Sequence, residues 1–132
     1  MSSEAEWRTW NLSGLDVTQL RFDFQFHVHM WSVERDLLIT FGAPFTFRSS
    51  AGDDHTIDPE RSENLSSLLS LLHRSVVSFA ASSEGECVLR FDDGAELRGK
   101  PHERYEAWES HATGTLEGAS LLCAVGGGSP WR

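Results

Sequence analysis

Two histidines at alternate positions, His27 and His29, are the residues whose spacing most directly suggests chemistry. Side chains two residues apart on a strand project from the same face. Paired imidazoles held in this way can bind zinc or a related metal, and Glu34 follows five residues after His29 as a third candidate ligand. Because Arg21 and Asp23 share the histidine parity, we favour a hydrated strand face and keep a metal site at His27, His29 and Glu34 as the alternative.

The spacing from His27 to Glu34 resembles the first metal motif of the cupin family. That resemblance implies a metal-dependent enzyme that uses the His27/His29 face. The chain departs from the motif at Arg21, where the family has a glycine, and no second motif (Pro-x-Gly followed by His) occurs downstream. A short motif of this kind is a hypothesis, so we assign no metal, cofactor or catalytic residue.

Patterns typical of nucleophilic catalysis are absent from the sequence. It contains no Gly-x-Ser-x-Gly, and neither Cys87 nor Cys123 adjoins a basic residue. Both cysteines lie in apolar, strand-like stretches, where we expect buried, reduced thiols. Glu106 and Glu109 fall on opposite faces of a predicted strand, so they do not form a pair for acid–base catalysis. We therefore expect a protein that is not an enzyme.

Acidic and aromatic residues of the second half form the predicted partner site. Asp92 and Asp93 precede Gly94 in a hairpin turn, and Glu106 and Trp108 occupy a strand close by in sequence. Carboxylates around an indole would suit an arginine or lysine of a basic partner. The competing interpretation, in which Trp108 is a core residue, remains open because large aromatic residues on strands are usually buried.

The charge of the chain limits its partners. The 132 residues carry a formal net charge of −9, which disfavours nucleic acid and anionic membranes and favours a basic protein. No stretch approaches the roughly 20 apolar residues of a membrane-spanning helix, and the charged N-terminal residues do not form a signal peptide, so we expect a cytoplasmic protein. Self-association through a sheet edge, giving a homodimer, is a third interpretation.

Hydrophobic periodicity predicts an α+β fold. Apolar residues alternate over 20–30 and again over 37–47, where Gly42–Pro44 interrupts the run and predicts a bend or an edge. Asp58 and Pro59 begin a predicted helix at 59–73 with a leucine stripe. A meander of strands follows. The expected order is β-β-α-β-β-β-β-β, with the helix on an antiparallel sheet; the alternative is a half-barrel wrapped round the helix.

We expect one domain over 1–132, with 1–14 a loosely attached lead-in and 126–132 a flexible tail. The predicted core consists of Phe22, Phe24, Phe26, Val28, Leu65, Leu68, Leu69, Leu72, Phe79, Leu89 and Phe91.

The second half of the chain resembles a known family. Leu89–Leu97 contains the acidic Asp-Gly hairpin, Tyr105–Glu109 reads Tyr-Glu-Ala-Trp-Glu, and Gly126–Gly128 is glycine-rich. Together, over about 62–128, these segments are similar to a family of small uncharacterised bacterial proteins. Related small acidic proteins include the immunity proteins of bacterial toxin systems, so the resemblance implies a protein that acts by binding. It carries over no catalytic residue.

Overall fold

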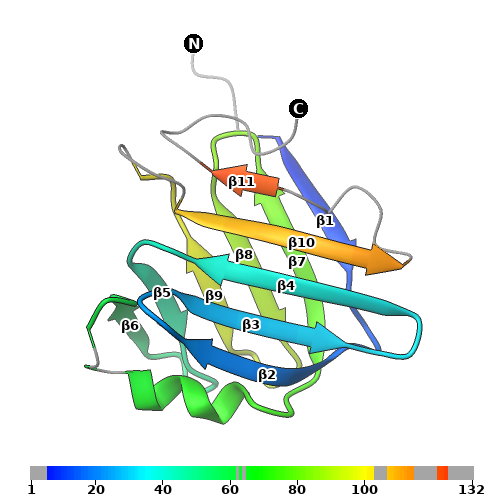
Figure 1. Cartoon of the computed structure of the whole chain (residues 1–132), viewed down its shortest axis with the longest axis horizontal. Helices are drawn as coiled ribbons and strands as arrows, with labels where there is room; N and C mark the ends of the chain where they lie inside the picture. Colours follow the sequence, from blue (N-terminus) through cyan, green and yellow to red (C-terminus); the bar gives the residue numbers. More distant parts are fainter. Residues whose placement is uncertain (1–5, 62, 64, 103–106, 115–121, 125–132) are drawn as a thin grey trace.

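The computed structural model describes residues 6–61, 63, 65–102, 107–114 and 122–124, and its described part is built mostly from strands. The strands form two antiparallel sheets (Figure 1). The five-stranded sheet has the order β11 (Leu122–Ala124), β10 (Trp108–Gly114), β4 (Arg35–Phe41), β3 (Phe26–Trp31), β2 (Asp16–Phe22). The six-stranded sheet has the order β1 (Trp7–Asn11), β7 (Val76–Ser82), β8 (Cys87–Phe91), β9 (Glu96–Gly99), β5 (Phe45–Arg48), β6 (Asp54–Ile57).

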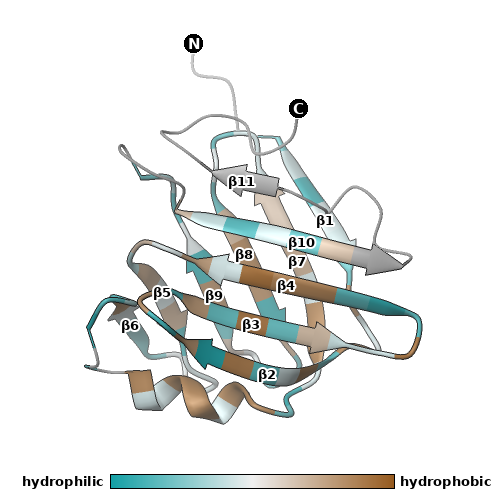
Figure 2. Cartoon of the chain, viewed as in Figure 1, coloured by the Kyte–Doolittle hydropathy of each residue, from teal (hydrophilic) through white to brown (hydrophobic). Residues whose placement is uncertain are grey.

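The two sheets pack face to face as a sandwich. In Figure 1 the strands of the five-stranded sheet lie in front and cross those of the six-stranded sheet behind. Both sheets contribute to one apolar core: Phe26, Ile39 and Phe41 face inward from one, and Phe79 and Leu89 from the other. Along β3, Figure 2 shows apolar and polar residues in alternation, as expected for a strand with one buried face.

The predicted α+β class is wrong, because two sheets rather than one sheet and a helix enclose the core. The predicted half-barrel round a helix is wrong for the same reason. In the described residues the single helical segment is a short 3-10 helix, η1 (Leu65–Leu71). It contributes Leu68 and Leu71 to the core that the sheets already share.

The predicted helix at 59–73 is shorter and tighter in the structure. Asp58 does not cap an α-helix; its carboxylate accepts from the backbone N–H of Glu60, and its carbonyl accepts from Arg61, which closes a turn. The following 3-10 helix repeats every three residues. That period turns Leu65, Leu68 and Leu71 toward the core and leaves Leu69 56% exposed. The α-helical stripe was therefore wrong for Leu69 and Leu72, which are exposed, and it missed Leu71, which is buried.

The predicted strand at 20–30 is a hairpin. β2 ends at Phe22 and β3 begins at Phe26, with these two residues paired across the turn. Because the turn is symmetric about Phe24, the even-numbered residues at 20–22 and 26–30 share one face, and the alternation continues through the break. Phe24 itself stands at the tip, 79% exposed and at a φ of 68°.

The interruption at Gly42–Pro44 separates two strands that belong to different sheets. β4 ends at Phe41 in the five-stranded sheet, and β5 begins at Phe45 in the six-stranded sheet. The backbone N–H of Gly42 donates to the carbonyl of Ala107, 2.9 Å away. Proline cannot continue a ladder, so the expected bend becomes the crossing between the two layers.

The predicted lead-in is part of the sandwich from Trp7 onward. Trp7–Asn11 forms β1, an edge strand paired with β7, and Leu12 and Leu15 after it are fully buried. The description of 1–14 as loosely attached is therefore wrong for 7–14. The tail predicted at 126–132 lies outside the described residues.

The predicted meander of the second half is confirmed for β7 to β9 and is wrong for β10, which pairs with β4 in the other sheet. β7, β8 and β9 are consecutive antiparallel neighbours, and the Asp93-Gly94 turn joins β8 to β9 with Gly94 at a φ of 91°. Of the predicted core, Phe26, Val28, Leu68, Phe79, Leu89 and Phe91 are buried. Phe22, Phe24, Leu69 and Leu72 are exposed, and Leu65 is half-buried. Within the described residues, none of the helical structure has the length and hydrophobicity that crossing a membrane requires.

The thiol of Cys87 is expected to resist modification in the native protein. Cys87 is a free cysteine in the core, and its burial raises the pKa of the thiol well above its ordinary value, which suppresses the reactive thiolate. In a Cys123→Ser variant, a chromogenic disulfide reagent should react slowly at neutral pH and stoichiometrically once denaturant unfolds the chain. Complete reaction within seconds in native buffer would contradict this burial.

Candidate functional site

Polar side chains gather on the outer face of the five-stranded sheet. Strand pairing aligns Gln19 with His29, His29 with Leu38, and Leu38 with His111, so one row of four side chains crosses β2, β3, β4 and β10. The next row contains Arg21, His27, Thr40 and Glu109. The two predicted histidines are therefore on one face of β3, as expected, and that face continues onto three further strands.

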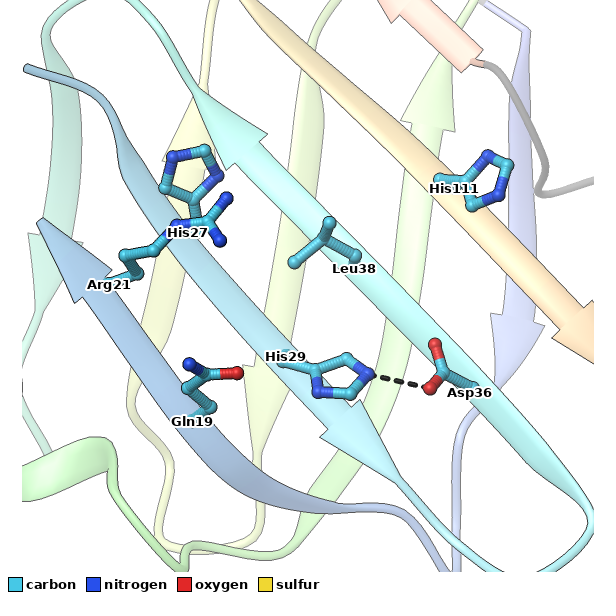
Figure 3. Close-up of a pocket in the computed structure, with 7 residues that line it drawn as sticks. All are labelled: Gln19, Arg21, His27, His29, Asp36, Leu38 and His111. Carbon is cyan, nitrogen blue, oxygen red and sulfur yellow. Dashed lines mark hydrogen bonds and ion pairs between the residues drawn. The ribbon is translucent and has the colours of Figure 1, made fainter. Parts of the chain in front are cut away.

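This face is hollowed. A pocket of about 220 Å³ is lined by Gln19, Arg21, His27, His29, Asp36, Leu38 and His111. Figure 3 shows Leu38 between the histidines of β3 and His111 of β10. An apolar floor ringed by polar groups can hold a small ligand or one side chain of a partner, but the volume is below the roughly 300–1,000 Å³ of most small-molecule sites.

His27 is held rigidly at one end of the pocket. Its Nε2 donates to Oδ1 of Asp23 at 2.7 Å, and its Nδ1 shares a hydrogen bond of 2.9 Å with the hydroxyl of Thr40. The hydrogen bond with His27 holds the pKa of Asp23 below its ordinary value. A hydroxyl, an imidazole and a carboxylate in series are the components of a nucleophilic triad. Here His27 and Thr40 are 7% and 5% exposed, so the series orients the ring and presents no accessible nucleophile.

His29 and His111 are the more accessible imidazoles. Nε2 of His29 donates to Oδ2 of Asp36 at 2.6 Å, an interaction drawn in Figure 3. This bond fixes the ring and leaves Nδ1 facing away from the carboxylate. His111 is exposed on β10, and its imidazole forms no hydrogen bond with the part of the chain that the structure describes. Arg21 reaches Asp23 through Nε at 3.4 Å.

The alternative metal site is not assembled. His27 and His29 point from the same face, but Glu34 lies in the turn between β3 and β4 and does not line the pocket. Among the residues that the structure describes, no three His, Cys, Asp or Glu side chains lie close enough together to hold a metal ion. The Nε2 atom of each histidine is instead hydrogen-bonded to an aspartate.

The predicted partner site is not brought together at the surface. Trp108 pairs with Phe41 on β4, which turns its indole into the core; it is 1% exposed and donates to the carbonyl of Gly85 at 2.8 Å. The anchor role assigned to this indole is therefore wrong, and Trp108 is a core residue. Glu106 lies outside the described residues.

Asp92 and Asp93 are also far from Trp108 along the sheet. They follow β8, whereas Gly85, the partner of Trp108, precedes β8 at its opposite end. Asp92 is exposed, and Asp93 forms an ion pair with Arg74 at 3.3 Å and accepts from the N–H of Ala95. The two aspartates therefore do not share a surface with the indole.

Several pocket residues were missed from the sequence. Asp36 follows the turn after β3, and its place opposite Trp31 could have been read from the hairpin pairing. The place of His111 could not be predicted in this way, because β10 pairs with β4, which is more than sixty residues earlier in the chain. The pairing of distant strands leaves no local pattern in the sequence.

Comparison with protein families finds one whose description is a family of unknown function, DUF6188, matching residues 8–132. The chain belongs to this family. The match covers nearly the whole sequence, including the strands that carry the outer-face pocket. Comparisons with curated proteins and with solved structures find no match. The function of this DUF6188 protein is therefore inferred from the geometry of its outer-face pocket.

Proposed function

We propose that this protein is a non-catalytic binding protein whose docking face is the outer surface of the five-stranded sheet. The docking face comprises the two rows of side chains around the pocket together with two exposed aromatic residues, Phe24 in the turn before β3 and Trp31 at the last position of β3. The observation that carries the proposal is this pairing of exposed aromatics with a hollowed polar face between them. Exposed aromatics and small pockets of this kind are the usual anchor points of protein interfaces.

Phe24 supports the proposal most directly. It is 79% exposed in the turn and holds a φ of 68°, which disfavours a bulky side chain by about 1–2 kcal/mol. Neither exposure nor that backbone conformation stabilises the fold. A large apolar side chain that is both exposed and held in a strained backbone conformation supports a contact with another molecule.

The partner is expected to be a basic protein. The net charge of the chain is −9, and the strands of the docking face carry Asp16, Asp36 and Glu109. Complementary charge accelerates association with a basic partner. An immunity-like role, in which binding neutralises a toxin, is one form of this function.

The experiment is quantitative capture from a native lysate with two matched variants. Phe24→Ser/Gln19→Lys alters the docking face, and Trp7→Ser/Thr9→Lys makes the same kinds of change at exposed positions of β1 in the other sheet. We expect a basic protein to be retained by the wild type and by the β1 variant, and about tenfold less by the docking-face variant. Equal retention by both variants would show that the interaction uses another surface.

Small-ligand binding is the second candidate, favoured by the pocket itself. Arg21, Gln19 and His111 surround the apolar side chain of Leu38, a set that suits a small aromatic carboxylate. Benzoate should then shift the ring resonances of His111 saturably, and unchanged resonances at high benzoate concentration would exclude this class of ligand.

A further inference from the structure

Trp31 is an exposed indole with an aspartate on each side. It is 49% exposed on the outer face of β3. Strand pairing places it directly opposite Asp16 of β2 and directly opposite Asp36 of β4. Side chains directly opposite one another in an antiparallel sheet have Cβ atoms about 4.5–5.5 Å apart. The three side chains therefore form a row, carboxylate, indole, carboxylate, at the end of the docking face away from Phe24.

Neither aspartate has a cationic partner of the kind that other acids in this protein have. Arginines pair with Asp23, Asp54, Asp58, Asp93 and Glu96. Asp36 receives one hydrogen bond from His29, and Asp16 receives one from the hydroxyl of Ser75 at 2.9 Å. Within the described part of the chain, no arginine or lysine forms an ion pair with either aspartate.

Open space lies beside the indole. A hollow of about 410 Å³ is bordered by Trp31, Asp16 and Val33, and also by His73. Arg35 is close in sequence, but its guanidinium donates to the carbonyls of Asn11 and Ser13. It is therefore committed to the backbone at the start of the chain and does not neutralise the two aspartates.

We propose that Trp31, Asp16 and Asp36 form the seat of an arginine side chain from the basic partner. A guanidinium stacks on the face of an indole and donates in its own plane to carboxylates on either side. Lysine lacks the planar donor set that this row would use. The inference rests on the proposed function and adds to it the residue type that the docking face selects.

The test uses short peptides, so it does not depend on identifying the natural partner. Acetyl-Gly-Arg-Gly-amide is titrated into the full chain while the indole N–H resonance of Trp31, assigned with a Trp31→Phe variant, is followed by NMR. The control peptide carries citrulline, which keeps the shape of arginine without its charge. We expect saturable shifts with a dissociation constant on the order of millimolar for the arginine peptide and at least about fivefold weaker binding for citrulline.

Matched variants locate the carboxylates. Asp16→Asn/Asp36→Asn keeps the side-chain shape and one acceptor oxygen at each position but removes both charges, and it should weaken binding of the arginine peptide about tenfold. Asp53→Asn/Asp92→Asn removes the charges of two exposed aspartates elsewhere and should leave that binding unchanged. Equal binding of the two peptides, or unchanged binding to the first variant with its thermal unfolding intact, would overturn the seat. The two proposals can fail separately. If the arginine peptide binds as expected but the Phe24→Ser/Gln19→Lys variant still captures the partner, the proposed docking face is wrong and the arginine site is retained.

Discussion

Replacing Phe26 with alanine should lower the free energy of unfolding by about 3–5 kcal/mol. Phe26 is fully buried at the start of β3, and its ring stacks with those of Phe41 and Phe45 at centroid distances of 6.3 and 5.5 Å. Phe41 belongs to the same sheet and Phe45 to the opposite one, so this ring links the two layers. Truncation leaves a cavity between the sheets that backbone movement fills only in part. Chemical denaturation at equilibrium measures the loss.

Phe24→Ala is the matched control, two residues away in the sequence. Because Phe24 is 79% exposed at the tip of the hairpin, its truncation should change the free energy of unfolding by less than about 0.5 kcal/mol. Similar losses for Phe24 and Phe26 would mean that the hairpin turn is misplaced and that residues 20–30 form one continuous strand.

Gly99→Ala should destabilise the protein by about 1–3 kcal/mol. Gly99 ends β9 against the core, and a Cβ built there would lie 2.9 Å from Sγ of Cys87, 3.0 Å from Trp108 and 3.2 Å from Phe41. The closest of these atoms belongs to a side chain that packing holds in place. The strain must be relieved by moving rings or strands, which overpacking makes costly. Equilibrium unfolding again provides the measurement.

A double-mutant cycle identifies the clash. Cys87→Ala removes the sulfur that the new methyl group would meet, so the double variant should be more stable than the sum of the single losses predicts, by at least about 0.5 kcal/mol. Strict additivity would place the cost of Gly99→Ala elsewhere, at Trp108 or Phe41.

The sequence alone was enough to predict alternation, turns and charge. The alternation around β3, the Asp93-Gly94 hairpin and the antiparallel run from β7 to β9 follow from short-range patterns, and the structure confirms them. Local propensity favours a helix for this run of leucines, but it does not decide between an α-helix and a 3-10 helix. Here packing against the sheets decided it and turned Leu71 inward and Leu69 outward.

The site was predictable only in part. His27 and His29 share a face because side chains alternate along any strand. Their hydrogen-bond partners Asp23 and Asp36 lie in adjacent turns or strands, within reach of a hairpin argument. His111 entered the pocket through β10, whose pairing with β4 no local pattern encodes. That same pairing turned Trp108 into the core and removed the partner site predicted around it.

What the sequence by itself determined is therefore the strand character of most of the chain, the parity of side chains around β3 and the net negative charge, because each depends on neighbouring residues or on composition. The tertiary structure alone decided that the chain crosses from one sheet to the other at Gly42–Pro44 and that β10 returns to the first sheet. It also decided that Trp108 rather than Trp31 is buried, and that Asp16, Trp31 and Asp36 stand in one row. These outcomes depend on which distant strands pair and which face each pair turns to the core. That choice is set by the burial of the whole apolar surface at once.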